Sequence, residues 1–265
     1  MCPPRPTLPA LRAKKSYGQH FLAQPAVARQ IAYGVDLAGV DHVLEVGPGQ
    51  GMLTQFLLER GVPLTAVEAD ADMVAHLRDV LPDWAPAHVV SADFLRVDLA
   101  ALTRGRPTAL VGNFPYNISS QILVRLVDDR ALFPRMVGMF QRELAERVLS
   151  PPGSKTYGAI SVLVQAYYAG TVMLHLKPGS FNPPPKVNST VIALERLPPD
   201  RQPDADEATL RRVVRAAFNQ RRKMLRNSLR ALWPTLDPDD PNLQRRPEQL
   251  TVAEFAALAR RVAAG

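Results

Sequence analysis

From about residue 43 onward, short apolar runs alternate with segments whose apolar residues recur at helical spacing. The apolar runs have strand length, and they predict β-strands at residues 42–47, 63–69, 87–93, 108–113 and 135–140. The helical patterns between them lie at residues 52–61, 71–81 and 119–129. Strands separated by helix-length crossovers predict an α/β fold, in which a parallel sheet is covered by helices on both faces and ligands bind at the carboxyl ends of the strands.

The pattern changes after these strands. Residues 141–148 predict a helix with internal ion pairs, to which we assign no catalytic role, and residues 158–168 predict another helix. Strands are expected at residues 171–176 and 190–197. The proline-rich residues 177–189 between them resemble a long hairpin-like connection that projects a loop.

The C-terminal part begins after "LPPDRQPD" at residues 197–204, which predicts a linker. Helical patterns at residues 206–219, 221–233 and 248–263 follow, with the turn-rich "PTLDPDDPN" before the last of them. They predict a small all-helical domain. We therefore expect the chain to divide into a flexible basic arm at residues 1–15, an α/β domain at residues 16–198 and a helical domain at residues 205–265.

Composition narrows the class of protein. With 265 residues, 46% of them hydrophobic and 22% charged, the chain has the composition of a folded soluble protein. No apolar run reaches the roughly 18 residues of a membrane span, and the N-terminal residues lack the apolar core of a secretory signal. We expect a cytoplasmic protein without a membrane partner. The lone Cys2 excludes an intrachain disulfide, and the histidines lack paired metal-ligand spacing, so no metal is expected.

The net charge of +7 and the isoelectric point near 9.8 predict a polyanionic partner. Arginine supplies most of the positive charge, and guanidinium groups pair with phosphates and stack on bases, as RNA recognition requires. Arginine-rich composition also follows genome base composition. Charge alone therefore does not identify the partner.

A glycine loop joins the first predicted strand to its helix. The segment "LEVGPGQGML" contains Gly47, Gly49 and Gly51, and glycine lets a backbone approach a ligand closely. A tight turn, a dinucleotide site and an S-adenosylmethionine site are all compatible with such a loop. The spacing disfavours a dinucleotide dehydrogenase, whose motif would require glycine or alanine at Met52.

Acidic residues end the next predicted strands. Glu68 ends the second strand, where a carboxylate accepts both ribose hydroxyls of a bound nucleoside. Asp93 ends the third strand, where it can accept a hydrogen bond from an adenine amino group. Either residue alone could be an exposed strand-end charge. Together with the glycine loop they predict an adenosine pocket.

The fourth predicted strand ends in "NFPY", residues 113–116. An isolated motif of this kind is usually a strand-ending turn. Beside a nucleoside pocket it has a chemical use, because the Asn113 oxygen and a backbone carbonyl at Phe114 or Pro115 can hold an adenine amine with its lone pair aimed at a methyl donor. Pro115 fixes the turn, and Tyr116 offers a face on which a base can stack.

These segments resemble the ribosomal RNA adenine N6,N6-dimethyltransferase family, the dimethyladenosine transferases of the small ribosomal subunit. The resemblance covers nearly the whole chain and lies in blocks that follow the order of the family. It implies a Rossmann-like S-adenosylmethionine-dependent methyltransferase sheet with helices on both faces, and a small C-terminal all-helical domain. The blocks are "KKSYGQHFL" (14–22), "VLEVGPGQGMLT" (43–54), "VEAD" (67–70), "SADFL" (91–95), "NFPYNIS" (113–119), "MFQRELAERV" (139–148), "YGAISVLVQ" (157–165), "SFNPPPKVNS" (180–189) and "AFNQRRKMLRN" (217–227).

The resemblance also implies roles for single residues. Asn113, Phe114, Pro115 and Tyr116 would hold the target amine, and Phe181 would stack on the flipped adenine from the opposite side. The cofactor would be S-adenosyl-L-methionine, leaving S-adenosyl-L-homocysteine, without a metal. The residues implied in binding it are His20, Leu22, Gly47, Gly49, Glu68, Asp93 and Asn113.

The chain departs from the family pattern at His20, where asparagine is usual, and at Phe114, where leucine is usual. A histidine still donates or accepts hydrogen bonds near the cofactor, so we expect a modest effect on affinity. The role of residue 114 is expected to run through its backbone, which makes the side chain less important.

A basic segment, "QRRKMLRNSLR" at residues 220–230, is expected to form one short helical span. A solvated basic helix face is its ordinary explanation. Beside an adenine-methylating site it would contact the RNA phosphate backbone, which supplies affinity without reading sequence. The residues expected to bind RNA are Arg221, Arg222, Lys223 and Arg226.

The function implied is dimethylation of N6 on two adjacent adenines in the 3′-terminal hairpin loop of small-subunit (16S) ribosomal RNA, with a role in biogenesis of the small subunit. The expected substrate is this RNA within a precursor 30S particle, and the expected state is a monomer. The alternatives are a resistance-type methyltransferase of large-subunit RNA, an assembly factor for which binding matters more than methylation, and a dehydrogenase, which the glycine spacing disfavours.

Overall fold

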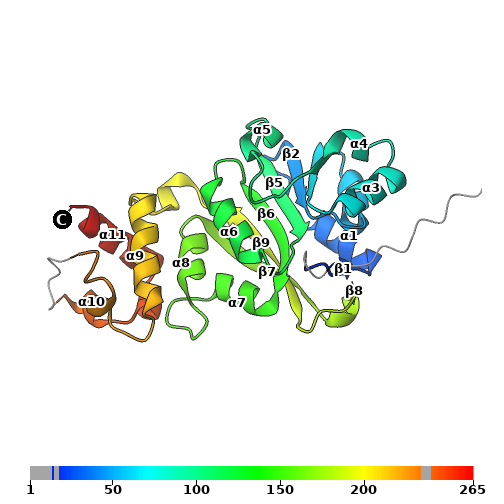
Figure 1. Ribbon diagram of the computed structural model, residues 1–265. Coiled ribbons are helices and arrows are strands. Elements are labelled where there is room, and N and C mark those ends of the chain that lie inside the picture. Colours follow the sequence, from blue (N-terminus) through cyan, green and yellow to red (C-terminus); the bar gives the residue numbers. More distant parts are fainter. Residues whose placement is uncertain (1–13, 15–17, 234–239, 265) are drawn as a thin grey trace, which may run out of the picture.

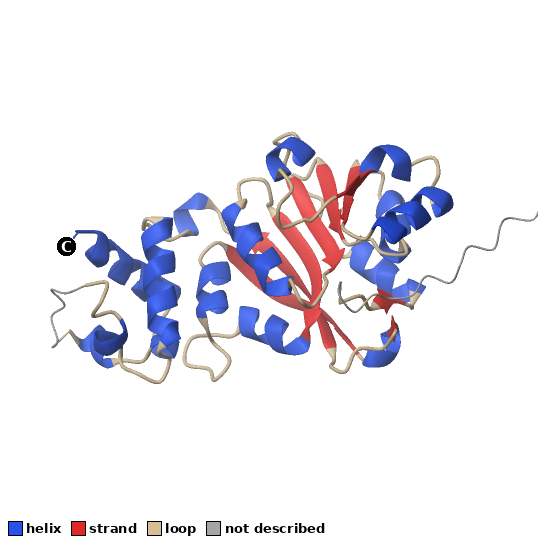
Figure 2. Cartoon of the chain, viewed as in Figure 1, coloured by secondary structure: helices blue, strands red, loops and turns tan. Residues whose placement is uncertain are grey.

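A seven-stranded mixed sheet runs through the middle of the described chain, which in this computed structural model comprises residue 14 and residues 18–233 and 240–264 (Figures 1 and 2). The expected basic arm lies outside these residues except for Lys14, as does most of the turn-rich segment at 234–242. The strands of the sheet are β2 (His42–Val46), β3 (Leu64–Glu68), β4 (Val89–Ser91), β5 (Thr108–Asn113), β6 (Arg135–Gln141), β7 (Tyr168–Leu176) and β9 (Ser189–Arg196). A separate antiparallel pair joins β1 (Phe21–Leu22) to β8 (Phe181–Asn182).

The strand order is β4-β3-β2-β5-β6-β9-β7. The pairs from β4 to β6 are parallel, which confirms the parallel arrangement expected from the alternating pattern. By contrast, β9 runs antiparallel to both β6 and β7. The expected hairpin-like connection therefore joins two neighbouring strands of the same sheet, and its short strand β8 pairs with β1.

Helices cover both faces of the sheet (Figure 2). Their bounds are α1 (Pro25–Tyr33), α2 (Met52–Leu58), α3 (Ala71–Val80), α4 (Ala85–His88), α5 (Leu99–Thr103), α6 (Ser119–Asp128), α7 (Arg142–Leu149), α8 (Ala159–Gln165), α9 (Glu207–Asn219), α10 (Leu225–Ser228) and α11 (Val252–Ala264). Short 3₁₀ helices lie at η2 (Pro178–Ser180), η3 (Pro199–Arg201), η4 (Pro241–Gln244) and η5 (Pro247–Gln249). None of the helices in these described ranges is long and apolar enough to cross a bilayer.

The two faces follow from the alternation of side chains along each strand. Leu110 of β5 packs in one hydrophobic cluster with α5, α6 and α8, whereas its neighbours Ala109 and Val111 pack in another with α1 and α2. The same alternation separates Leu44 from Val43 in β2. Because the central strands are covered on both faces, the open edge for ligands is their carboxyl end.

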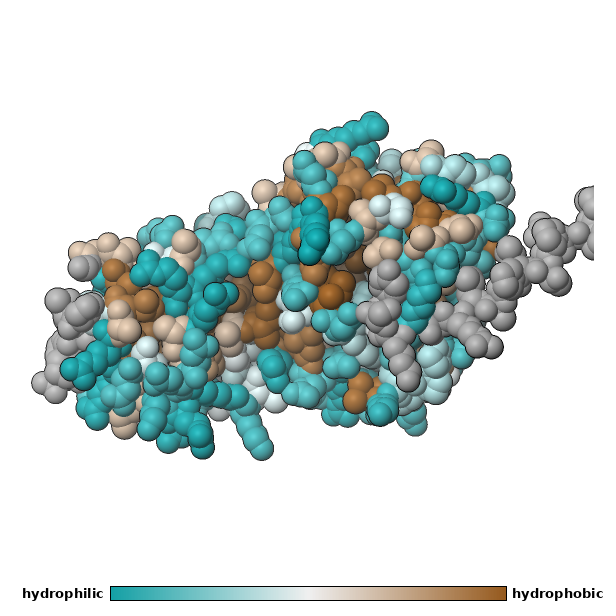
Figure 3. Space-filling view, viewed as in Figure 1, coloured by the Kyte–Doolittle hydropathy of each residue, from teal (hydrophilic) through white to brown (hydrophobic). Residues whose placement is uncertain are grey.

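The C-terminal helices pack directly against the α/β part. Buried residues of α9 and α11 belong to the same hydrophobic cluster as α6 and α8. The Phe218 ring bridges the two parts, with centroids 6.2 Å from Tyr157 and 5.8 Å from Phe255. Arg130, which follows α6, pairs with Glu207 at the start of α9 at 2.6 Å. In Figure 3 hydrophobic residues are visible in the middle of the molecule, and hydrophilic residues cover most of the lower edge of the C-terminal part at the left.

One predicted helix is wrong over most of its length. A helix was expected at residues 221–233, but only Leu225–Ser228 is helical and residues 221–222 lie in a turn. Two tertiary contacts account for this difference. The Leu225 amide donates to the Arg245 carbonyl at 2.9 Å, and the buried Leu229 packs within the C-terminal core rather than along a continued helix.

Other element boundaries also differ from expectation. Helix α8 ends at Gln165, because Tyr168 already belongs to β7, where its hydroxyl donates to the Phe133 carbonyl at 2.9 Å. Strand β4 is shorter than expected, since residues 85–88 form α4. The elements α1, α5, β1 and β8 were not predicted. The short strands β1 and β8 have no periodicity of their own to reveal them, because their pairing is with each other across the chain.

We predict that His42 makes the protein less stable as the pH falls from about 6.5 to 4. His42 is buried at the start of β2, where its ring nitrogens lie 2.9 Å from the Thr65 hydroxyl and 3.3 Å from the Thr108 hydroxyl. Burial lowers the pKa of His42 to about 4, and the charges of Arg106 and Arg104 act in the same direction. The unfolded chain therefore binds a proton before the folded chain does, and acid favours unfolding.

Denaturant unfolding at several pH values would measure this effect. The wild-type protein should lose up to about 3 kcal/mol more than His42→Gln between pH 6.5 and 4. Substitution of the exposed His88 by glutamine is the control and should leave the pH dependence unchanged. Identical pH profiles for wild type and His42→Gln would contradict the assignment.

Candidate active site

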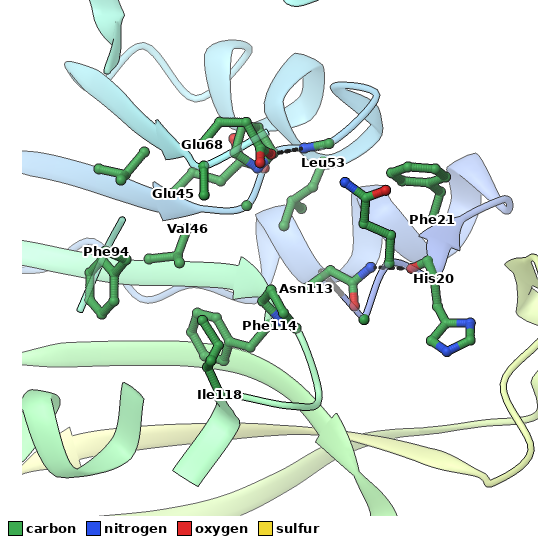
Figure 4. Close-up of a pocket in the computed structure, with 18 of the residues that line it drawn as sticks. His20, Phe21, Glu45, Val46, Leu53, Glu68, Phe94, Asn113, Phe114 and Ile118 are labelled. Carbon is green, nitrogen blue, oxygen red and sulfur yellow. Dashed lines mark hydrogen bonds between the residues drawn. The ribbon is translucent and has the colours of Figure 1, made fainter. Parts of the chain in front are cut away.

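A cavity of about 450 Å³ opens at the carboxyl ends of the parallel strands (Figure 4). Its walls come from the loops after β2, β4 and β5, from the end of β3, and from residues 18–22 around β1. Its volume suits a small organic ligand. Among the residues expected at the site, those that line it are His20, Leu22, Gly47, Gly49, Glu68, Asp93, Asn113, Phe114, Pro115 and Tyr116.

The glycine loop forms one wall of this cavity. Gly47, Gly49 and Gly51 have φ values of 68°, 54° and 81°, a region that other residues rarely adopt. A side chain on Gly49 would also come within 3.0 Å of the Phe21 ring, so the loop packs closely against β1. The backbone amide of Gly49 faces the end of β3 and donates to the Glu68 carboxylate at 3.1 Å.

Glu68 is held by backbone groups at the end of β3. Its second oxygen accepts from the Asp70 amide at 2.9 Å, so both carboxylate oxygens are oriented. Figure 4 shows the Glu68 side chain in the wall of the cavity. Burial raises the pKa of Glu68, and the two backbone hydrogen bonds oppose that rise. This position, between the glycine loop and the start of α3, is the one that the sequence predicts for a ribose-binding carboxylate.

Asp93 lines the cavity from the loop after β4, the edge strand next to β3. One carboxylate oxygen accepts from the Leu95 amide at 2.9 Å, and the side chain is half exposed. The other oxygen lies 3.6 Å from the exposed Arg96. Asp93 is thus fixed by a local turn while an acceptor remains accessible at the cavity wall.

A network of polar groups, not found from the sequence, ties the chain before β1 to the start of α3. Lys14 pairs with Asp70 at 2.6 Å and with Asp72 at 2.7 Å, and Gln19 donates to Asp70 at 3.0 Å. The hydrogen bonds with these two carboxylates raise the pKa of Lys14. Asp70 also caps α3 by accepting from the Asp72 amide. The network holds residues 18–22 against the cavity.

The Asn113 carboxamide is oriented by a backbone carbonyl. Its amide nitrogen donates to the His20 carbonyl at 2.8 Å (Figure 4), so the carboxamide oxygen is the atom left to face a ligand. The Pro115 carbonyl already accepts from the Ile118 amide at 3.2 Å and from the Ser119 hydroxyl at 2.8 Å. Of the two carbonyls expected to hold the amine, the Pro115 carbonyl therefore serves the turn itself.

The packing around Phe114 explains why position 114 accommodates a side chain larger than leucine. Its ring is buried, with its centroid 5.2 Å from that of Phe140. The ring lies over Gly112 and Gly138, neighbours in β5 and β6, where any side chain would collide with it. The absence of side chains at these two glycines makes room for the phenylalanine, and the expectation that its side chain matters little to the chemistry agrees with this packing.

Phe181 is not brought into the cavity wall. Its side chain is 4% exposed and packs in the cluster of Leu22, Leu176 and Val191, while its backbone pairs with Leu22. The arrangement matches that of an aromatic anchor for the hairpin connection. A stacking role for Phe181 stays a prediction, and it would require the ring to leave this packing.

The basic residues expected to bind RNA lie at the C-terminal end of the molecule, around α10 (Figure 1). Arg222, Lys223 and Arg226 are exposed. Arg221 differs from them, because its guanidinium donates to the Lys155 carbonyl and lies 4.0 Å from Glu248. It ties the loop after α7 to the C-terminal helices. The turn that replaces the start of the expected helix presents Arg222 and Lys223 to solvent, and the short helix α10 presents Arg226.

Glu45 is a site residue that the sequence reasoning missed. It lines the cavity from β2, is 1% exposed, and its Oε2 atom has no hydrogen-bond partner among the described residues. Burial raises the pKa of Glu45 to about 8; the neighbouring Thr54 hydroxyl opposes the rise, and the Glu68 carboxylate adds to it. The signal was present in "HVLEVG", where a carboxylate interrupts an otherwise apolar buried strand.

Three features together define a Rossmann-like methyltransferase. They are a sheet that is parallel from β4 to β6 with β9 antiparallel to both of its neighbours, a glycine loop after β2, and acids at the ends of the next strands. The profile of the family described as "Ribosomal RNA adenine dimethylase" matches residues 10–255. The chain belongs to this family of enzymes. Its membership confirms the resemblance and the fold class predicted from the sequence.

Individual proteins agree with that membership. The "Ribosomal RNA small subunit methyltransferase A" of Bacteroides thetaiotaomicron is 44% identical over 254 residues, covering 95% of this chain and 94% of its own. Among solved structures, a dimethyladenosine transferase from Plasmodium falciparum has a TM-score of 0.76 at 23% identity, covering 92% of this chain and 98% of its own. The 23S rRNA methyltransferase ErmE has a TM-score of 0.65 at 24% identity, covering 92% and 99%. The two structures share the fold.

We predict that Glu45 destabilises the ligand-free protein at alkaline pH. A carboxyl group whose pKa rises from about 4.5 to about 8 on folding contributes stability below pH 4.5 that is lost as the pH rises through 8. Glu45→Gln should therefore be more stable than wild type at pH 9 by several kcal/mol, on the order of 1.4 kcal/mol per unit of pKa, and about equal at pH 5.

Unfolding in denaturant at both pH values measures the difference. Glu59→Gln, at the exposed end of α2, is the matched control and should follow wild type at each pH. An equal stability difference at pH 5 and pH 9 would show that Glu45 does not carry the titration.

Proposed function

We propose that this enzyme transfers methyl groups from S-adenosylmethionine to N6 of two adjacent adenines in the 3′-terminal hairpin loop of small-subunit ribosomal RNA. The observation that carries the proposal is that the Asn113–Tyr116 segment opens into the same cavity as the glycine loop and Glu68. A nucleoside-binding wall and an amine-binding turn thus share one space. The name of the Bacteroides relative supports the small subunit as the source of the RNA.

The residues of the cavity fit S-adenosylmethionine. The cofactor supplies an activated methyl group on a sulfonium centre when it is bound. Glu68 would accept the ribose hydroxyls, and Asp93 would accept from the adenine amino group. The unpartnered Oε2 of the buried Glu45 would accept from the ammonium group, which a buried carboxylate requires as a partner. No group of three or more histidine, cysteine, aspartate or glutamate side chains in the described ranges is arranged to hold a metal ion.

The protein's contribution to the reaction is to orient the target amine. The Asn113 oxygen accepts one N–H, and the Phe114 carbonyl accepts the other, because the Pro115 carbonyl is already used within the turn. With both N–H groups of the unmethylated amine held out of the ring plane, the lone pair of N6 loses its conjugation with the ring and points at the methyl group. In each transfer N6 would gain one bond to carbon as the bond between that methyl carbon and sulfur breaks, S-adenosylhomocysteine would leave as a neutral thioether, and the amine would lose one proton to water.

Tyr116 provides the stacking surface for the flipped base. Its ring lines the cavity next to Asn113, and its hydroxyl is fixed in the protein rather than free in solvent. Flipping is required because a stacked amine cannot reach a buried methyl group. Phe181 would close the opposite side of the base only after leaving its packing against Leu22.

The RNA would also contact the exposed cations of the C-terminal helices. Arg222, Lys223 and Arg226 would bind phosphates and position the particle without reading sequence, whereas Arg221 would hold the turn that presents Arg222 and Lys223. We propose a monomer in the cytoplasm that acts on a precursor 30S particle and contributes to its maturation. We also propose the domain division at residues 16–198 and 205–265. The buried contacts between α8 and α9 would hold the two parts together while both face the RNA.

We predict that the purified protein methylates unmethylated small-subunit particles. Labelled S-adenosylmethionine should yield dimethyladenosine at two neighbouring adenines near the 3′ end of the RNA, as mapped by nuclease digestion and mass spectrometry. Large-subunit RNA is the control substrate and should remain unlabelled. Methyladenosine on the large-subunit RNA alone would instead assign a resistance-type activity, and binding to particles without transfer to either RNA would leave an assembly factor.

We predict that Asn113→Ala lowers the rate of methyl transfer by at least about 100-fold, because the amine loses its positioned acceptor. Binding of the variant to small-subunit particles should stay within a fewfold of wild type, since the phosphate contacts are elsewhere. Rapid-mix transfer assays and particle-binding titrations measure the two effects. Asn219→Ala, at the exposed end of α9, is the matched control. Near-normal transfer by Asn113→Ala would remove Asn113 from the mechanism.

A further inference from the structure

The hydroxyl of Tyr116 is hydrogen-bonded to a residue far away in the sequence. Its oxygen lies 2.5 Å from the hydroxyl oxygen of Ser189, which is 0% exposed. Ser189 is the first residue of β9, at the end of the proline-rich hairpin connection. The pattern of the sequence gave Tyr116 a role at the site and gave Ser189 none.

Ser189 is a rigid anchor, because β9 is paired on both sides. In the register of the sheet Ser189 is opposite Gln141 of β6 and Leu176 of β7. The preceding residue is held as well, since the Asn188 carbonyl accepts from the Arg142 amide at 2.9 Å. Tyr116, by contrast, belongs to the loop between β5 and α6. The hydrogen bond therefore ties a loop side chain to the end of a strand that is paired on both sides.

The ring of Tyr116 is also flanked on one side. The imidazole of His20 lies with its centroid 5.4 Å away, tilted by 32°. The His20 ring is itself held, because its Nδ1 atom lies 2.8 Å from the Pro183 carbonyl oxygen, and it extends away from Asn113 (Figure 4). The Tyr116 hydroxyl is hydrogen-bonded to Ser189, and the His20 imidazole beside the ring is itself hydrogen-bonded. The Tyr116 side chain therefore has little freedom to rotate about its torsions.

We infer that Ser189 is a positioning residue for the reaction, which holds the Tyr116 ring in the orientation that receives the target adenine. The inference rests on the proposed function and adds to it a residue of the hairpin connection. A stacking surface that is already oriented does not have to be ordered when the base arrives. The conformational entropy of the Tyr116 side chain is therefore lost on folding and not on binding of the RNA. The cofactor-binding wall, formed by the glycine loop and Glu68, does not involve this hydrogen bond.

A double-mutant cycle tests the inference in the full-length enzyme acting on unmethylated small-subunit particles. Ser189→Ala and Tyr116→Phe each remove one partner of the same hydrogen bond and leave the ring in place. Each should lower kcat/KM for the particle by roughly two- to tenfold, as loss of one hydrogen bond does. The KM for S-adenosylmethionine should be unchanged. The double variant should be no worse than either single variant, because the bond can be lost only once.

Thr190→Val is the matched control. Thr190 is the next residue of β9 and is equally buried, but its hydroxyl lies 3.1 Å from Nδ1 of His175, away from Tyr116. Its kcat/KM should stay within twofold of wild type. Thermal unfolding of every variant shows whether a loss of activity reflects a loss of fold.

The outcomes separate this inference from the proposed function. Wild-type transfer with a normal Ser189→Ala variant would overturn the inference and leave the function standing. Effects of the two single variants that add in the double variant would also overturn it, because they would be independent. Absence of methyl transfer by the wild-type enzyme would overturn the function itself, before any variant is compared.

Discussion

The parallel pairing of β2 with β3 on one side and β5 on the other is the constraint on which the rest of the structure depends. Parallel strands end at the same edge of a sheet, so their pairing brings the glycine loop, Glu68 and Asn113 together although they are far apart along the chain. The pairing also buries both faces of the sheet, which leaves this edge as the place where backbone and carboxylate groups can remain available to a ligand.

A second layer of contacts turns this edge into a site with defined chemistry. The segment before α1 reaches the edge from the outside, where the His20 carbonyl orients the Asn113 amide and Gln19 joins the Asp70 network. The pair β1–β8 links that segment to the hairpin connection. The hairpin, through Ser189, then fixes Tyr116. The same connection therefore contacts both the chain segment that orients Asn113 and the Tyr116 side chain.

Much of the site could be predicted because its chemistry resides in short local segments. Glu68 and Asp93 end strands whose apolar runs are visible in the sequence, and Gly49 belongs to a loop whose composition alone indicates close backbone approach. The helix expected over the basic segment is wrong for most of its length. Only Leu225–Ser228 is helical, because the Leu225 amide donates to the Arg245 carbonyl and Leu229 packs in the core. Local propensity encodes neither contact.

The sequence by itself determined the parallel strands, the helices between them and the identity of the groups at the strand ends, because these follow from periodicity and from residue type over a few positions. Only the tertiary structure decided how those groups are oriented. The burial of Phe181 and the hydrogen bond from Tyr116 to Ser189 depend on long-range pairing of β1, β8 and β9. Such pairing depends on the packing of the whole sheet, and a local pattern contains no information about which distant residue will lie opposite.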